Sequence, residues 1–526
     1  MAAAQPELTH RRRLALSTAI FSLATGLSRV LGLIREMVAA YYFGAKGPIN
    51  AFTVAFQIPN LVRALVADAA LSSAFVPVFS DLLEKGERKR AWRVASTLLW
   101  LMLLGLGGLS AFLMLIAPLL LKPFHPVDLD LAVTLSRILF PIVALLGVSG
   151  VVVGILNSYE QFTIPALTPV FWNLAIILGL VLGVPQASTS DTKLYVYAGS
   201  ILVATLIQVL LPLPWLRGLD GRLQMVIDWR DPAVLQTFKL MIPVTLGLGL
   251  INVNALIDTF FASRYIDPDI APAAIDKAFR IYMLPQGMFS VAVATVLFPS
   301  LARLASRRDM DGFRNTVSLG LRQIGFLLVP ASVITAVLAE PIVRLIYQRG
   351  QFDEHSTTVV AGALAAFSLG LTFNGTMLML NRAFFSLQSN WVPTVVALGN
   401  LGLNALLDAL FFHLGVWGIP LSTSLVNIAG TAALFLFLRH RLGRLELRET
   451  AIVGLKVIVA GALLAVVAYP IWRGLDAALG RSFLAQVVSL GVALTAGTAA
   501  YLIACRALRV REMQALLSLR SRFRRG

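Results

Sequence analysis

The hydrophobic pattern of this chain is a series of long apolar stretches separated by short polar segments. At 1.5 Å per residue, each stretch is long enough to cross about 30 Å of hydrocarbon as a helix. We therefore expect an all-α polytopic membrane protein. The pattern predicts fourteen transmembrane helices, at residues 14–43, 49–80, 93–121, 130–156, 162–184, 194–216, 233–263, 272–302, 314–339, 356–386, 391–413, 416–438, 449–472 and 482–506.

Composition supports this class. Of the 526 residues, 58% are hydrophobic and 13% are charged, whereas a soluble domain carries about 25% charged residues. Residues Arg11–Arg13 before the first stretch superficially resemble the start of a signal peptide. That stretch is too long for a signal peptide and lacks a small-residue cleavage site, so we expect a retained span. The single cysteine, Cys505, excludes an intramolecular disulfide.

The basic residues predict the orientation in the membrane. Fourteen spans is an even number, so both termini lie on one side. Most loop arginines and lysines fall on that side, and the positive-inside rule then places both termini in the cytoplasm. The net charge of +17 is thus explained by topology and by contact with anionic lipid headgroups, and not by nucleic-acid binding.

Two sequence echoes indicate an internal duplication. The echoed prolines lie 222 residues apart in one pair and 228 in the other, an offset of six helices, which predicts parallel repeats. Such transporters bind substrate at the interface between repeats and move one lobe against the other. The echoes are Phe75–Ser96 with Leu297–Ser318, which contain Pro77 and Pro299, and Asn157–Asn173 with Phe385–Asn400, which contain Pro165 and Pro393.

The duplication predicts two six-helix lobes followed by two additional C-terminal helices. Further helix breaks are expected at Pro59 and Pro285, because proline removes a backbone hydrogen bond. The predicted segments are a cytoplasmic N-terminus (1–13), an N-terminal lobe (14–217), a cytoplasmic linker (218–230), a C-terminal lobe (231–440), the two additional helices (441–506) and a basic cytoplasmic tail (507–526).

Charged residues inside the first two spans are the candidate functional residues. Arg29 and Arg63 lie near the middle of their spans, close to Arg35, Glu36 and Asp68. A guanidinium at bilayer depth costs at least ~3 kcal/mol on insertion scales, so it should face a polar interior. Arginine binds phosphate or carboxylate through two parallel hydrogen bonds. These residues predict a water-filled, anion-binding cavity; ion pairs between helices or snorkelling side chains are the alternatives.

Several long motifs resemble the MurJ/MviN family, the bacterial lipid II flippases of the multidrug/oligosaccharidyl-lipid/polysaccharide exporter superfamily. The resemblance covers about residues 14–440 and implies transport of undecaprenyl-diphosphate-linked peptidoglycan precursor to the outer leaflet. The motifs are SRVLGLIRE (Ser28–Glu36), IPNLVRALVADAALSSAFVPVFSDLLEKG (Ile58–Gly86), FRIYMLPQGMFSVAVATVLFPSLARL (Phe279–Leu304), YQRGQFD (Tyr347–Asp353) and FFSLQSNWVPT (Phe384–Thr394).

The resemblance also implies roles for particular residues. Glu36 and Asp68 keep an acidic group, whereas Asn50 and Met283 depart from acidic or amide residues of many members. In the family, the two extra helices form a groove for the lipid tail; the alternative is that they only pack against the C-terminal lobe. The family's cavity arginines correspond to Arg29, Arg35, Arg63 and Arg280.

A second polar group is expected in the C-terminal lobe. Asn404 and Asp408 are four residues apart and share a helix face, while Asp258 and Thr423 lie in neighbouring spans. Their oxygens suit a hard cation, and some relatives have a sodium site at matching positions. A protonated aspartate or an amide–carboxylate hydrogen bond between helices is the alternative.

Other function classes are less compatible with the sequence. No nucleotide-binding glycine-rich loop and no Cys/His metal spacing occurs, so we expect a transporter that needs no cofactor beyond a coupling ion. The remaining alternatives are a polysaccharide-lipid or drug exporter of the same superfamily and a non-transporting scaffold that binds cell-wall synthesis proteins. A two-lobe cavity is complete within one chain, which favours a monomer.

Overall fold

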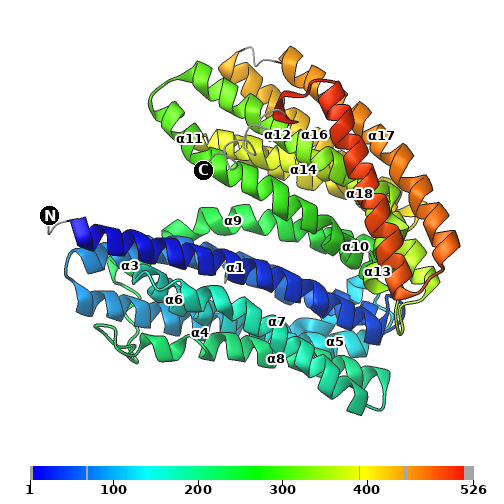
Figure 1. The fold of residues 1–526 in the computed structure, drawn as a ribbon. Helices are drawn as coiled ribbons and strands as arrows, with labels where there is room; N and C mark the ends of the chain where they lie inside the picture. The colour runs from blue at the N-terminus through cyan, green and yellow to red at the C-terminus, as the bar shows by residue number, and fades with distance from the viewer. Residues whose placement is uncertain (1–3, 67–68, 390, 444–446, 514–526) are drawn as a thin grey trace. The chain divides into compact units, whose positions relative to one another are not determined.

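The structure is a computed structural model that describes residues 4–66, 69–389, 391–443 and 447–513. These residues form helices, turns and loops, with no strand among them, which confirms the predicted all-α class. The chain divides into two compact units, the first covering residues 1–264 and 268–270 and the second the remaining residues. Figure 1 shows the order of the helices along the chain.

The first unit packs around α4, α6 and α3. Its core contains Phe75 and Phe79 of α3, Trp92 and Leu98 of α4, and Ile155 of α6. The helices of this unit are α1 (Ala4–Phe43), α2 (Ile49–Val66), α3 (Ala69–Glu84), α4 (Arg88–Leu121), α5 (Leu129–Leu139), α6 (Pro141–Ser158), α7 (Thr163–Gly183), α8 (Ser190–Leu210) and α9 (Pro232–Phe261), with short 3-10 turns η1 (Lys122–Phe124), η2 (Val184–Gln186) and η3 (Leu213–Leu216).

The second unit is organised around α14, which packs against α10, α12 and α16. Its helices are α10 (Ala271–Pro285), α11 (Val291–Ser306), α12 (Met310–Val337), α13 (Ala339–Tyr347), α14 (Glu354–Ser386), α15 (Trp391–Phe411), α16 (Gly418–Leu442), α17 (Leu447–Leu479) and α18 (Phe483–Ala507), with the π-helical turn η5 (Gln286–Ser290) and the 3-10 turn η6 (Phe412–Leu414). A further π-helical turn, η4 (Ala262–Ile266), lies where the two units join.

Helix α9 belongs to the first compact unit, whereas the repeat assigns this span to the C-terminal lobe. Hydrogen bonding agrees with the compact unit, since the Thr245 hydroxyl of α9 donates to the Leu65 carbonyl of α2 at 2.8 Å. The compact units are defined by contacts, whereas the predicted lobes are defined by the sequence repeat. The predicted lobe limits therefore stay predictions.

The duplication is visible in the lengths of corresponding helices and in the turns that follow them. Helices α3 and α11 each have 16 residues, and Pro77 and Pro299 occupy the same place in them. Two residues beyond each helix the backbone turns left-handed, at Gly86 (φ 77°) and at Arg308 (φ 56°). The same left-handed backbone turn thus follows both copies of the helix. This agreement confirms the repeat inferred from the first echo.

The second echo extends over a longer segment. Helices α7 and α15 each have 21 residues, with Pro165 and Pro393 at the third position. Each is followed directly by a three-residue 3-10 turn, η2 or η6. Helices α8 and α16 then start at Ser190 and Gly418, at the same offset of 228 residues.

Most predicted spans are single helices in the structure. Eleven helical segments of the described residues are long and apolar enough to cross a membrane. Helices α1, α9 and the pair α2–α3 correspond in position to the other three predicted spans. Helix α1 starts at Ala4, ten residues before the predicted limit. The predicted break at Pro285 is confirmed, because α10 ends there and a π-helical turn follows, whereas α2 continues through Pro59.

The two C-terminal helices form an antiparallel hairpin that packs on α12 and α13 (Figure 1). Close approach at its centre requires small residues, since a Cβ at Gly497 would lie 2.8 Å from the Ala468 Cβ. Tight packing of small residues is a main source of helix association in lipid. One turn after Gly497, the Tyr501 hydroxyl of α18 donates to the Phe326 carbonyl of α12 at 2.7 Å.

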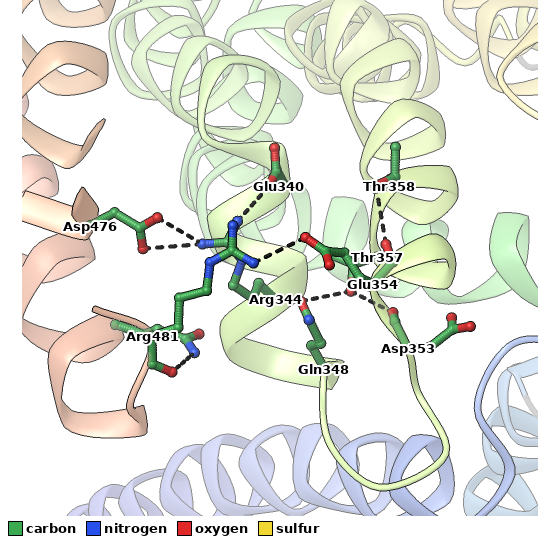
Figure 2. A network of polar contacts seen from close by, with 10 residues as sticks. Glu340, Arg344, Gln348, Asp353, Glu354, Thr357, Thr358, Asp476 and Arg481 are labelled. Atoms are coloured by element: carbon green, nitrogen blue, oxygen red, sulfur yellow. Dashed lines mark hydrogen bonds and ion pairs between the residues drawn. The ribbon is translucent and has the colours of Figure 1, made fainter. Parts of the chain in front are cut away.

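An ionic cluster attaches this hairpin to α13 (Figure 2). The Arg344 guanidinium donates from one nitrogen to both Asp476 carboxylate oxygens at 3.1 Å, and from another to Glu340 at 2.5 Å. Arg481 binds Glu354 at 3.0 Å nearby. Helix α13 itself lies between the predicted spans 314–339 and 356–386, in a segment for which no helix was predicted. We call the four residues Arg344, Glu340, Asp476 and Trp472, whose ring lies 5.9 Å from the guanidinium, the hairpin latch.

Candidate functional site

The α1–α7 interface contains two of the predicted acidic and basic residues. Arg35 of α1 is mostly buried and binds the adjacent Glu36 at 2.5 Å, while its guanidinium lies 4.9 Å from the ring centroid of Trp172 on α7. The Arg35 Nε is buried and has no hydrogen-bond acceptor. A guanidinium over an aromatic face is stabilised by the ring quadrupole. Arg35 is thus held partly by its own helix and partly by α7, with one donor group unused.

Helix α1 approaches α7 closely one to two turns before Arg35. The Asn173 amide of α7 donates to the Ser28 carbonyl at 3.3 Å and to its own helix at the Pro169 carbonyl, 2.9 Å. A Cβ at Gly32 would lie 3.8 Å from the Asn173 amide oxygen, an oxygen that is buried without a donor. Ser28, Gly32 and Arg35 therefore share the α1 face that contacts α7.

Arg29 follows Ser28 and points away from this interface. Successive helix residues differ by about 100° in direction, and Arg29 is exposed in the structure. Leu27 and Val30 beside it are exposed as well. Within the described part of the chain no carboxylate forms an ion pair with Arg29. Its donors are therefore available to a ligand.

Arg63 lies in the last turn of α2. Its Nε and Nη2 both donate to the Asn60 side-chain oxygen, at 3.2 and 2.8 Å. A bond to the residue three positions earlier directs the guanidinium back along its own helix. Asp68, predicted to lie close by, falls outside the described residues.

Arg280 lies in the second unit, on α10. Its Nε donates to the Asp276 carboxylate one turn earlier at 2.8 Å, and about a third of each side chain is exposed. Helix α10 begins at Ala271, one residue before the predicted span 272–302. Arg280 belongs to the second compact unit, and its meeting with the arginines of the first unit stays a prediction.

Asn50 and Met283, which depart from the residues expected at these positions, lie in different surroundings. Asn50 is fully buried, and its amide donates to the carbonyls of Ala45, Gly47 and Asp269. It therefore stabilises the turn before α2, a role that an acidic residue could not fill because it has no donor. Met283 on α10 is exposed.

The predicted ion-binding residues are divided between the units. Asn404 and Asp408 are both fully buried on α15, and the Asn404 amide donates to the Asp408 carboxylate at 3.0 Å. Thr423 lies on α16, which packs against α15, and its hydroxyl donates to Ile419 at 3.4 Å. Asp258 belongs to the first unit, where the Asn254 amide lies 3.3 Å from its carboxylate. No group of three metal-ligating His, Cys, Asp or Glu residues occurs among the described residues.

Comparison with known proteins identifies the family. The family model described as lipid II flippase MurJ matches residues 39–493. This range contains Arg63 and Arg280 together with both members of each sequence echo. The chain belongs to the MurJ family of lipid II flippases.

Individual MurJ relatives agree over most of their length. A probable lipid II flippase MurJ of Buchnera aphidicola is 32% identical over 415 residues, which covers 77% of this chain and 80% of the relative. The lipid II flippase MurJ of Burkholderia cenocepacia is 31% identical over 434 residues, with 79% and 82% covered.

Solved structures show the same fold. A lipid II flippase MurJ in an inward closed conformation has a TM-score of 0.76 at 23% identity, and the alignment covers 93% of this chain and 99% of that one. An inward-facing MATE family transporter of the MOP superfamily has a TM-score of 0.63 at 17% identity, with 81% and 95% covered. MurJ membership makes this chain an integral membrane transporter, not an enzyme.

Sequence reasoning missed two partners of the MurJ arginines, Trp172 beside Arg35 and Asn60 beside Arg63. Trp172 was noticed only as part of an echoed motif, and Asn60 was not singled out. A signal existed for Asn60, which lies three residues before Arg63 on the same helix. For Trp172 none existed, since it lies 137 residues from Arg35 and only the packing of α1 on α7 brings them together.

Proposed function

We propose that this MurJ-family chain flips lipid II, the undecaprenyl-diphosphate-linked peptidoglycan precursor, from the cytoplasmic to the outer leaflet by alternating access. Family membership over residues 39–493 supports the substrate class. The observation that carries the mechanism is Arg29, an exposed arginine in the middle of a membrane-length helix. Such a residue is costly in hydrocarbon and reasonable in a polar transport path.

The arginines suit the chemistry of the headgroup. A diphosphate that leaves the interface loses hydration, and charge-assisted bidentate hydrogen bonds offset that loss. Arg29 offers its donors to solvent, and Arg35 keeps a buried Nε without an acceptor. Arg63 and Arg280 are predicted further contributors, and Glu36 positions Arg35. The polyprenyl tail can remain in the bilayer while the headgroup moves, and the α17–α18 hairpin is a proposed surface for it.

Transport by the purified protein in liposomes tests this function. We expect lipid II added to one leaflet to become accessible at the other, and Arg29→Ala to slow this exchange. Arg307→Ala, at an exposed end of α11, is the matched control and should retain the parent rate. Exchange of an undecaprenyl-linked polysaccharide precursor or a cationic drug, with none of lipid II, would favour the exporter alternative instead.

Sodium is proposed as a coupling ion through Asn404 and Asp408. The pair is fully buried within the second unit, and a bound cation would offset the cost of a buried carboxylate. Thr423 on the adjacent α16 and Asp258 stay predicted ligands. A cation can bias a transport cycle only through unequal affinity for its states. Sodium-dependent exchange at constant ionic strength would support coupling, and equal rates in sodium and potassium would argue for a hydrogen-bonded pair without an ion.

We further propose that both termini are cytoplasmic, in the bacterial inner membrane, and that the protein acts as a monomer. Single cysteines introduced after Cys505→Ala test the orientation. Cysteines at Lys46 and Gln351 should react with an impermeant external reagent, and those at Lys85 and Arg441 should not. The reverse pattern would invert the orientation and the direction of transport.

A further inference from the structure

The segment between α8 and α9 is bound along the first turns of α4. We call residues 218–231 the strap. The Trp100 indole of α4 donates to the Gln224 carbonyl at 3.0 Å, and the Ser96 hydroxyl accepts from the Gln224 amide at 2.9 Å. One step further, the Thr97 hydroxyl accepts from the Asp228 amide at 3.1 Å. Side chains of α4 thus form hydrogen bonds with backbone groups of the strap at Gln224 and Asp228.

Alternation along the strap separates an inner edge from an outer edge. Val226 and Asp228 are partly buried toward α4. Met225, Ile227 and Trp229 are 86%, 48% and 58% exposed. The backbone bends at Met225 and turns across residues 228–231, so these three large apolar side chains lie at alternate, exposed positions of an irregular segment. On a soluble protein, a loop that exposes three large apolar side chains so close together would be unusual.

The depth of this edge follows from α4. Trp100, which binds the strap, is one turn before Leu104, about 6 Å along the axis. Leu104 begins the exposed apolar face of α4, which continues through Phe112, Leu115 and Leu119. That face is the lipid-facing side of a membrane-length helix. In the proposed orientation, the strap therefore lies at the cytoplasmic end of this apolar face, where the lipid headgroups and first acyl carbons are expected.

Ion pairs neutralise the acidic ends of the strap. Asp220 binds Arg88 at 3.0 Å and also accepts from the Tyr159 hydroxyl. Asp231 binds Arg90 at 3.1 Å. These contacts hold the pKa of Asp231 below its usual range, chiefly through the hydrogen bond from Arg90.

Exposed arginines flank the apolar edge. Arg222 and Arg230 are exposed on the strap, and Arg93 is exposed on α4, on the face that also bears Trp100. The Arg230 guanidinium lies 5.1 Å from the ring centroid of Trp229. An aromatic ring with a guanidinium beside it matches the boundary between acyl chains and phosphates.

We propose that the strap is a binding site for anionic phospholipid of the cytoplasmic leaflet. Met225, Ile227 and Trp229 enter the upper acyl region, while Arg93, Arg222 and Arg230 bind phosphate oxygens. The charge and the position beside the lipid-facing stripe favour a lipid over a protein partner. This site is separate from the transport path, since it lies on α4 and the strap and uses none of the proposed headgroup residues.

Fluorescence quenching by labelled lipids tests the proposal with the full-length protein. The probe is an environment-sensitive fluorophore on Ile227→Cys in a Cys505→Ala background. The vesicles contain phosphatidylcholine and phosphatidylglycerol, with a nitroxide on the upper acyl chain of one lipid at a time. The same fluorophore on Lys85→Cys, an exposed position on the proposed cytoplasmic side, is the matched control.

We expect nitroxide lipids to quench the probe at position 227 and not at position 85. Labelled phosphatidylglycerol should quench more strongly than labelled phosphatidylcholine. The apparent affinity for phosphatidylglycerol should be higher by up to about fivefold for each arginine that binds a headgroup. Arg222→Gln with Arg230→Gln should remove most of that preference, and added salt should reduce it.

Three outcomes would overturn the proposal. The first is water-like emission at position 227 without quenching by either lipid. The second is equal quenching by both lipids that the arginine substitutions leave unchanged. The third is a probe that is shielded in native membranes and solvent-exposed in liposomes of purified protein, which would indicate a protein partner. Circular dichroism of each variant shows whether the fold is retained.

Discussion

Two arginines in apolar helices of this protein differ in almost every physical respect. Arg29 on α1 is exposed, and no carboxylate of the described residues pairs with it. Arg344 on α13 is 4% exposed and binds Asp476 and Glu340, with Trp472 beside it. The same residue type is thus open to a ligand in one unit and enclosed by protein groups in the other.

The difference separates a binding role from a structural one. An enclosed arginine whose two terminal nitrogens bind carboxylates attaches the α17–α18 hairpin (Figure 2), and has little capacity left for a substrate. An exposed arginine contributes little to folding and keeps its donors for an anion. Arg35 lies between these cases, because Glu36 and Trp172 hold it while its Nε stays without an acceptor.

The largest expected effect is on transport through Arg29. Loss of a charge-assisted hydrogen bond removes about 1.5–3 kcal/mol, so Arg29→Ala should slow lipid II exchange roughly 10- to 100-fold. Arg29→Lys should restore little, since an ammonium cannot reproduce the planar fork. Thermal unfolding should remain near that of the parent. A variant with the parent exchange rate would show that exposure of Arg29 has no connection with the substrate.

The opposite outcome is expected for Arg344. Arg344→Met leaves two carboxylates without their counter-ion, and breaking a buried pair costs ~3 kcal/mol. Denaturation in detergent should show this loss. The double variant with Asp476→Leu should recover part of it, because both polar partners are then removed. Arg481→Ala breaks a more exposed pair and should cost at most about 1 kcal/mol. Equal losses for Arg344→Met and Arg481→Ala would remove the distinction between a buried latch and a surface pair.

Asp408 extends the comparison to a buried carboxyl group with a neutral partner. Asp408→Ala leaves the buried Asn404 amide without that acceptor, which should cost about 1–3 kcal/mol. If sodium binds this pair, the parent should melt at a higher temperature in sodium than in potassium at equal ionic strength. Asp408→Ala should abolish that difference. Identical melting of the parent in both salts would argue that the pair is hydrogen-bonded without an ion.

The smallest expected effect concerns Asp231 at the end of the strap. Because Arg90 lowers the pKa of Asp231 in the folded state, the pair stabilises the protein fully above the unfolded pKa of about 3.9. This contribution is lost as pH falls through the lower folded pKa. Stability of Asp231→Asn should therefore approach that of the parent in acid and fall below it at neutral pH. A constant difference between the two across this range would argue against the ion pair.

Much of the architecture was predictable because its causes are local. Membrane-length hydrophobicity predicted the spans, and the echoed prolines predicted two copies whose helices have equal lengths and equal turns. The break at Pro285 followed from the missing backbone donor. Helix α13 was missed because nine residues in a loop carry too weak a hydrophobic period, and their amphipathic character depends on the core that they cover.

The sequence by itself determined the class, the duplication and the presence of arginines at membrane depth, since hydropathy and proline positions act within a few turns of helix. Only the tertiary structure decided what each arginine does. Trp172 is brought to Arg35 by the packing of α1 on α7, and Asp476 to Arg344 across 132 residues by the hairpin. Solvation of a charge depends on which helices surround it, and that arrangement arises from packing between segments distant in the chain.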